Sequence, residues 1–241
     1  VSPERVVTIS LGIGSKSPKG VGAAVRACAR LFASEVEMGL TAEQINAGLD
    51  VIAAREPAIA RALSLAGYPP PRVRARGYIT LLRTIVGQQV SVAAANSVWN
   101  KLEATLGEIT PETLLAADFD TLRACGLSRQ KQGYARSLSE LVASGELVLE
   151  HLPEDDEEAI AQLTRIKGIG RWSAEIYLLF AEGRPDIFPA GDLAVQAGMG
   201  RILGLEERPS EKHIREASET WRPHRGAVTL LTWHCYNNAA L

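Results

Sequence analysis

The chain has 241 residues, of which 46% are hydrophobic and 22% are charged, so it is long enough for one large domain or two small ones with a sizeable core. It contains no run of 18 apolar residues and, before residue 38, no apolar segment with a small-residue cleavage site, so we expect neither a membrane span nor a secretory signal. A net charge of -2 does not by itself indicate a nucleic-acid-binding protein.

The N-terminal part of the chain divides into an extension and two helices. Residues 1–37 have weak periodicity, and we treat them as a poorly defined extension. Thr41 and Gln44 have the spacing of a capping box, which predicts a helix from there to about Arg55. Pro57 is expected to open a second short helix, and residues 68–71 (Tyr-Pro-Pro-Pro) form a stiff connector.

Beyond the connector the pattern is one helix after another. Turn signals separate the predicted helices, which we expect near 75–86, 91–106, 111–116, 118–124, 129–144, 155–164, 171–182, 192–203, 210–219 and 223–238. The only strand signal is a short one around residues 147–149. The fold class is therefore all-α.

Charge is unevenly distributed along this helical region. Residues 121–136 and 163–172 carry basic side chains and no acidic ones, whereas residues 150–158 are strongly acidic. This pattern fits a basic face with an acidic back, and it equally fits ordinary solvated charge. Cys28, Cys125 and Cys235 lie far apart, which favours reduced thiols in an intracellular protein.

Residues 163–173 read Leu-Thr-Arg-Ile-Lys-Gly-Ile-Gly-Arg-Trp-Ser, an apolar helix end followed by two glycines and a new helix. Gly168 and Gly170 allow a tight turn with positive φ and leave backbone N–H groups bare at the next helix N-terminus, where phosphate binds well. Lys167 and Arg171 add positive charge. An ordinary helix–glycine–helix corner is the alternative, which Ile169 between the glycines and the flanking basic residues disfavour.

Four ordered blocks between residues 87 and 225 carry a family resemblance. The hairpin at 163–173 and the loop 188–192 (Phe-Pro-Ala-Gly-Asp) resemble the helix-hairpin-helix and fixed aspartate of the base-excision DNA glycosylase superfamily. Residues 87–92 (Gly-Gln-Gln-Val-Ser-Val) and 221–225 (Trp-Arg-Pro-His-Arg) are similar to blocks of the alkylpurine glycosylases related to the bacterial inducible 3-methyladenine glycosylase.

The resemblance implies a two-lobed helical fold with the active-site cleft between the lobes, without the N-terminal β-domain of longer relatives. One lobe would take residues 75–182, including the helix-hairpin-helix at 155–182. The other would take residues 38–74 together with 190–241.

Asp192 is the catalytic candidate that the resemblance implies. Breaking the bond between sugar and base passes through a cationic, oxocarbenium-like state, which a fixed carboxylate stabilises, and the carboxylate can also orient or deprotonate water. Taken alone, an aspartate between Gly191 and Leu193 would be a helix N-cap, and both roles can coexist.

The resemblance also implies a monofunctional enzyme that leaves an abasic site. Bifunctional relatives cleave the strand through a lysine Schiff base two residues after the second hairpin glycine, and that position here is Trp172. Lys167 lies on the wrong side of the hairpin. The four-cysteine motif of the iron–sulfur branch is absent, so no such cluster is expected.

The base pocket is likewise assigned by resemblance. Trp172 and Trp233 match aromatic pocket positions, with Gln88 and Val92 also near the base, although core packing is the alternative for each tryptophan. Two positions depart from the family pattern. Ile176 replaces a second pocket aromatic, and Gln89 replaces the apolar wedge that fills the gap left by the flipped base.

A bound Na⁺ or K⁺ ion is implied in the hairpin, where the family shares it between carbonyls and a DNA phosphate. The matching carbonyls are those of Thr164, Ile166 and Ile169. No other cofactor is expected.

The function that these features predict is excision of alkylated purines from double-stranded DNA by an intracellular monomer, in the bacterial nucleoid. Two alternatives stay open. One is a superfamily glycosylase for oxidised or mismatched bases, which Trp172 and the missing cysteines disfavour. The other is a non-catalytic DNA-binding module, which an intact Asp192 disfavours.

Overall fold

The structure is a computed structural model that describes residues 39–238. The predicted extension at 1–37 and the expected absence of a secretory signal there lie outside the described residues. Within this part the chain forms twelve α-helices and two short 3₁₀ helices, with no β-strand, so the all-α prediction is confirmed. None of the described helices is long and apolar enough to cross a membrane.

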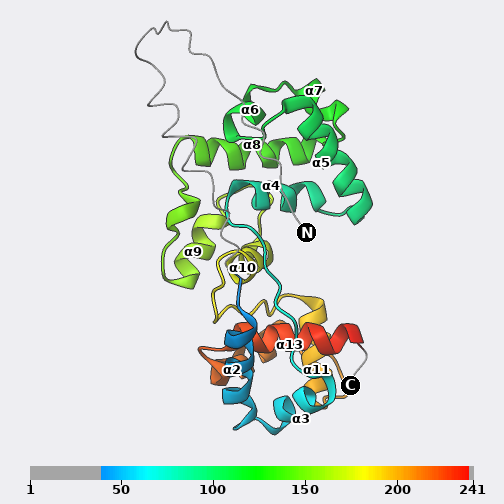
Figure 1. Ribbon diagram of the computed structural model, residues 1–241, viewed down its shortest axis with the longest axis vertical. Coiled ribbons are helices and arrows are strands. Elements are labelled where there is room, and N and C mark those ends of the chain that lie inside the picture. The colour runs from blue at the N-terminus through cyan, green and yellow to red at the C-terminus, as the bar shows by residue number, and fades with distance from the viewer. Residues whose placement is uncertain (1–38, 239–241) are drawn as a thin grey trace, which may run out of the picture. The chain divides into compact units, whose positions relative to one another are not determined.

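One group of helices comes from the middle of the chain (Figure 1). Helix α8 packs on α4, α6 and α7, and α4 in turn packs on α5 and α10. The bounds of the group are α4 (Tyr78–Gly87), α5 (Val92–Leu106), α6 (Pro111–Ala116), α7 (Phe119–Ala124), α8 (Arg129–Ala143), η1 (Leu149–His151), α9 (Asp156–Leu163) and α10 (Arg171–Phe180).

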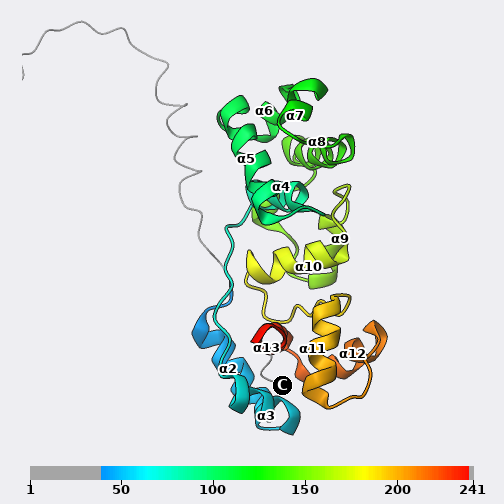
Figure 2. The same ribbon diagram turned by 90° about the vertical axis from the view of Figure 1, so that its right-hand side faces the viewer.

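A second group joins two segments that are far apart in the sequence. Helix α13 packs on α2, α3 and α11, so the beginning and the end of the described chain share one core (Figure 2). The bounds are α2 (Ala42–Ala53), α3 (Pro57–Ala66), α11 (Leu193–Leu203), α12 (Glu211–Ala217), η2 (Ser218–Trp221) and α13 (Arg225–Asn238).

Side-chain caps fix most of the helix starts that the sequence predicts. Thr41 accepts the backbone N–H of Gln44, whose side chain accepts the N–H of Thr41, so the predicted capping box is present. Serine, threonine or aspartate side chains cap further helices, each accepting a backbone N–H that the helix itself leaves unpaired. These capping residues are Ser91, Thr110, Asp118, Ser128, Asp155, Asp192 and Ser210.

Two local predictions need correction. The strand expected at 147–149 is wrong, because Leu149 begins the 3₁₀ helix η1 and the described part of the chain offers no partner strand. The helix expected at 210–219 ends at Ala217, where the hydroxyl of Ser218 donates to the carbonyl of Arg215 at 2.8 Å and the chain tightens into η2.

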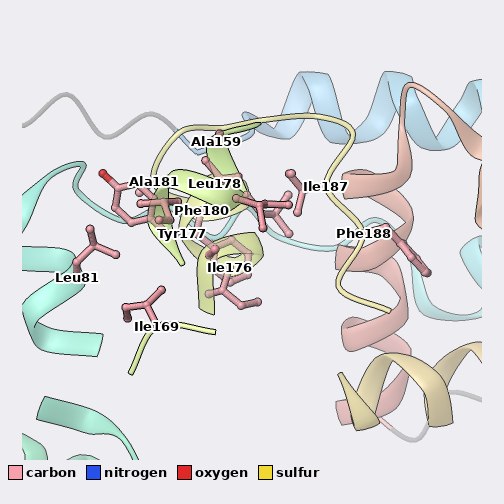
Figure 3. Close-up of a cluster of buried hydrophobic side chains, with 14 of the residues drawn as sticks. Leu81, Ala159, Ile169, Ile176, Tyr177, Leu178, Phe180, Ala181, Ile187 and Phe188 are labelled. Atoms are coloured by element: carbon pink, nitrogen blue, oxygen red, sulfur yellow. The ribbon is translucent and has the colours of Figure 1, made fainter. Parts of the chain in front are cut away.

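Helix α10 is buried on almost all sides and forms the centre of the molecule's apolar core. Every residue from Ala174 to Phe180 is buried. Figure 3 shows this helix among apolar side chains from other segments, including Leu81 of α4 and Ile187 of the following loop. A helix surrounded in this way is held rigidly, and its first turn carries part of the candidate site.

Two helical glycines differ in the space that they leave for a side chain. A Cβ atom at Gly198 of α11 would lie 2.6 Å from Cγ2 of Thr232 in α13, whereas a Cβ at Gly133 of α8 would meet nothing within 4 Å. We expect Gly198→Ala to lower the free energy of unfolding by about 1–3 kcal/mol through overpacking. We expect Gly133→Ala to raise it by up to about 1 kcal/mol through helix propensity. Urea denaturation of both variants checks the pair, and equal effects would contradict it.

Candidate active site

The hairpin uses its two glycines for different purposes. Gly168 has φ +84°, and a Cβ there would lie 2.1 Å from Cδ2 of Tyr134, so only glycine fits between the turn and this ring. Gly170 has an extended backbone with φ −89° and is the N-cap of α10. Positive φ is thus confined to Gly168. A Cβ at Gly170 would meet nothing within 4 Å, so this residue leaves the surface of the hairpin open.

The loop between α4 and α5 is tied to the hairpin. Nε2 of Gln88 donates to the carbonyl of Gly168 at 2.7 Å, and Nζ of Lys131 donates to the carbonyl of Val86 at 2.8 Å. Directly after these ties, Gln89 is exposed and has φ +55°, the only non-glycine residue with positive φ in the described chain. The loop therefore presents Gln89 at a strained, outward tip.

A hollow of about 770 Å³ lies between this loop, the start of α8 and the hairpin, and we call it the hairpin hollow. It is lined by both polar and apolar side chains and is open to solvent. The lining residues are Gly87, Gln88, Gln89, Val90, Gly126, Ser128, Gln130, Lys131, Tyr134, Gly168 and Trp172. The structure thus brings Gln88, Gln89, Gly168 and Trp172 together, as sites predicted from separate blocks of sequence.

Asp192 is the N-cap of α11, and its two oxygens have separate partners. Oδ1 accepts the backbone N–H groups of Ala194 at 2.7 Å and Val195 at 3.0 Å. Oδ2 accepts the indole N–H of Trp172 at 2.8 Å. Asp192 is therefore a helix N-cap through one oxygen, while its other oxygen faces the hairpin helix; its catalytic role stays a prediction.

Trp172 joins the hairpin to Asp192. It is the second residue of α10, its side chain is 47% exposed, and its ring lines the hairpin hollow. An exposed indole beside a carboxylate offers a flat aromatic surface on which a base can stack. Core packing, the alternative for this tryptophan, does not apply.

The loop before Asp192 is held by the block at 221–225. Trp221 is buried, and its ring contacts Phe188 edge-on with centroids 5.8 Å apart. Nε of Arg225 donates to Oδ1 of Asp186 at 2.9 Å, and Arg222 pairs with the same carboxylate. This block therefore fixes the loop from which the carboxylate of Asp192 projects.

The other predicted pocket residues lie elsewhere. Trp233 is 7% exposed and packs on Phe180, with the guanidinium of Arg72 5.5 Å from its ring centroid. Ile176 is a buried member of the α10 cluster (Figure 3). Val92 is 77% exposed at the start of α5. None of the three lines the hairpin hollow, and their roles beside a base stay predictions.

The arginines near the hairpin form ion pairs with carboxylates of the same chain. Arg171 pairs with Glu157 and with Glu175, and Arg165 pairs with Glu146. The acidic run is thus not a separate back to a basic face, because Glu157 lies against the hairpin's own arginine. Lys167 is exposed, and its backbone N–H donates to the hydroxyl of Ser137 at 3.1 Å.

The hairpin carbonyls fit the predicted cation site. The carbonyl of Ile166 accepts the N–H of Ile169 at 3.0 Å, while those of Thr164 and Ile169 accept no hydrogen bond from any residue between 39 and 238. Unpaired carbonyls of this kind suit a hard monovalent cation. In the same range no cluster of three His, Cys, Asp or Glu side chains could hold a metal ion, and Cys125 and Cys235 are buried free thiols.

Sequence reasoning missed two residues that shape the site. Tyr134 packs against Gly168, and Glu175 is a buried residue of α10 itself, four positions after Arg171. A glutamate inside an apolar helix segment was the available signal for Glu175. Nothing in the sequence connects Tyr134 with a residue 34 positions away.

Comparison with known proteins gives a consistent result. Residues 82–223 match the family described as "HhH-GPD superfamily base excision DNA repair protein". A DNA-3-methyladenine glycosylase of Schizosaccharomyces pombe is 35% identical over 161 residues, a match that covers 65% of this chain and 71% of that protein.

Solved structures agree with the sequence matches. The S. pombe 3-methyladenine DNA glycosylase in complex with abasic DNA superposes with a TM-score of 0.69 and 31% identity, over 80% of this chain and 98% of that one. A DNA-3-methyladenine glycosidase from Bacillus halodurans gives a TM-score of 0.73 and 29% identity, over 80% and 90% of the two chains. The chain therefore belongs to the HhH-GPD superfamily of base excision DNA repair proteins, in the branch of the 3-methyladenine DNA glycosylases.

Proposed function

We propose that this protein hydrolyses the N-glycosidic bond of alkylated purines of the 3-methyladenine type in double-stranded DNA. The observation that carries the proposal is the Asp192 carboxylate, held by α11 on one oxygen and by the half-exposed Trp172 ring on the other. The relatives named 3-methyladenine DNA glycosylase support this substrate class.

In this proposal the carboxylate of Asp192 stabilises the positive charge that develops on the sugar as the base departs. Its hydrogen bonds fix its orientation before reaction, so little reorganisation is needed in the transition state. The same carboxylate can orient the attacking water or accept its proton. The target nucleotide must first leave the duplex, and the Trp172 ring offers a stacking surface for a cationic alkylated purine.

The DNA backbone meets the hairpin in this proposal. Gly170 caps α10 without a side chain, which leaves the first N–H groups of that helix for a phosphate oxygen. Lys167 adds charge nearby, while Arg171 is already engaged by carboxylates. Gln89, at the strained loop tip, would enter the space that the flipped base leaves.

A Na⁺ or K⁺ ion would be held by the carbonyls of Thr164, Ile166 and Ile169. Two of these carbonyls have no other partner among the described residues, which supports the assignment. When bound, the ion would supply positive charge for a DNA phosphate at the hairpin.

We also infer that the enzyme acts as a monofunctional monomer inside the cell. Trp172 stands beside Asp192 where a lyase would need a lysine, and Nζ of Lys131 is committed to the carbonyl of Val86. Asp192, Trp172 and the hairpin all come from one chain, so a second copy is not needed to complete the site.

Replacing Asp192 by asparagine tests the catalytic assignment. Asparagine caps helices as well as aspartate does, so Asp192→Asn is expected to keep the fold while losing the charge. We expect release of methylated purines from DNA to fall by on the order of 100-fold to 1,000-fold. Single-turnover assays on methylated duplex measure this, with thermal denaturation as the check on folding. Full activity in the variant would refute the assignment.

The product of the reaction tests monofunctionality. Duplexes with a single alkylated purine, ethenoadenine, oxidised guanine or mismatch are incubated with the protein. The products are then analysed for strand breaks, with and without treatment with hot alkali. We expect breaks at the alkylated purine that require alkali, because no lysine forms a Schiff base beside Asp192. Strand breaks without alkali would contradict the proposal, and breaks only at oxidised guanine would redirect it to another substrate.

Variants at Gly170 test the hairpin as the phosphate site. A side chain here has free space in the protein alone, so both Gly170→Ala and Gly170→Glu are expected to fold. The glutamate should weaken affinity for undamaged duplex far more than the alanine, because it places negative charge against a phosphate. Fluorescence anisotropy measures both, and wild-type affinity should fall as salt rises. Equal affinities of Gly170→Glu and wild type would exclude the hairpin.

A further inference from the structure

A second cavity, of about 440 Å³, adjoins the first half of α10 through Arg171 and Glu175, and we call it the charged cavity. Helices α9, α10 and α12 and the segments around residues 186–188 and 219–225 line it. Its walls carry six carboxylates and four guanidinium groups. The charged residues are Asp156, Glu157, Arg171, Glu175, Asp186, Glu211, Arg215, Glu219, Arg222 and Arg225.

Glu175 is the buried member of this network. Its side chain is 3% exposed, and Oε1 accepts Nε of Arg171 at 2.9 Å while lying 3.8 Å from Nη1 of Arg215. A buried carboxylate without partners would cost several kcal/mol, so the two arginines are what allow its charge there. The three side chains link α10 to α12.

Each arginine continues to a second, more exposed carboxylate. Nη1 of Arg171 donates to Glu157 of α9 at 2.8 Å, and Nη2 of Arg215 donates to Glu211 of α12 at 2.8 Å. Glu175 therefore stands at the centre of a chain of five alternating charges. Loss of its charge would leave each arginine with only an exposed partner, and exposed pairs hold geometry weakly.

Two members of this chain, Arg171 and Glu211, adjoin the segments that hold the Asp192 carboxylate. Arg171 directly precedes Trp172, whose indole N–H binds Oδ2 of Asp192. Oε2 of Glu211 lies 3.5 Å from the position of a Cβ at Gly191, the residue before Asp192. The network thus adjoins the two segments that meet at the carboxylate.

We propose that Glu175 is a positioning residue for base excision: its carboxylate fixes Arg171 and Arg215, and through them the Trp172 ring and the turn that carries Asp192. This inference rests on the proposed function for its kinetic readout. Glu175 touches neither DNA nor the reacting atoms in this role.

The charge of Glu175 gives the proposal a pH signature. Burial raises the pKa of Glu175 to about 7, against the opposing effect of Arg171 and Arg215, while Glu157 adds to the rise. The groups that face it are Glu157 from α9, Arg171 from its own helix and Arg215 from α12. Below pH 6 the wild-type carboxyl is neutral, so removal of its charge changes little there. Above pH 8 the wild type is charged, and the difference is largest.

The test compares Glu175→Gln, which keeps the shape but not the charge, with a matched control. Glu182→Gln also removes a buried carboxylate that pairs with two arginines, but its partners are Arg76 and Arg184, at the end of α10 that lies away from Trp172. At pH 8 we expect Glu175→Gln to lower the single-turnover rate on methylated duplex roughly tenfold to 100-fold. Its Kd for undamaged duplex and the rate of the control should stay within about twofold of wild type.

Kinetic outcomes decide between positioning and mere stability. A rate deficit in Glu175→Gln that shrinks below pH 6, with partial recovery in Glu175→Asp at pH 8, supports the proposal. A native rate at pH 8 overturns it. A deficit of equal size at pH 6 and pH 8, or an equal deficit in Glu182→Gln, also overturns it.

A spectroscopic readout separates this proposal from the proposed function. The indole N–H resonance of Trp172, assigned through Trp172→Phe, reports its hydrogen bond to Asp192 without any substrate. We expect Glu175→Gln to shift this resonance and Glu182→Gln to leave it in place. An unshifted resonance refutes the positioning role even if the enzyme is active. A shifted resonance in a protein that releases no methylated base supports positioning and refutes the proposed substrate.

Discussion

The hydrogen bond from the Trp172 indole to Asp192 is the contact on which the site depends. It joins the first turn of the hairpin helix to the first turn of α11, which belong to different groups of helices. Because the other carboxylate oxygen is already used by two backbone N–H groups, the carboxylate has one orientation. The element that would grip the DNA backbone and the group that would act on the sugar are therefore fixed relative to each other.

The charged side chains near the hairpin mainly hold parts of this chain together. Arginines that the sequence places beside the hairpin bind carboxylates of the same chain, and Arg136 donates to the carbonyls of Leu115 and Ala117. In the proposed function, recognition of DNA then falls largely to backbone N–H groups at Gly170, to Lys167 and to the loop tip at Gln89. Such a design explains how a chain with a net charge of -2 can still act on DNA.

Much of the fold follows from local signals, and the site follows only in part. Helix starts agree with the predictions to within about three residues, because caps such as Ser91 and Ser128 act on their own first turn. The family resemblance also singles out Gly168, Trp172 and Asp192, and Trp172 lies beside each of the other two. The packing of Tyr134 on Gly168 and the burial of Trp233 against Phe180 depend on tertiary contacts, which no local pattern encodes. The strand expected at 147–149 failed for the same reason, since a strand needs a partner.

The shared core of α2, α3, α11 and α13 has a consequence for synthesis. Helices α2 and α3 leave the ribosome more than a hundred residues before α11, which at ordinary elongation rates means roughly ten seconds. During that interval Ile45, Leu49 and Ile59, fully buried in the finished protein, lack the neighbours that α11 and α13 provide. The central helices can meanwhile fold among themselves. Asp192, at the start of α11, therefore acquires its surroundings late in synthesis.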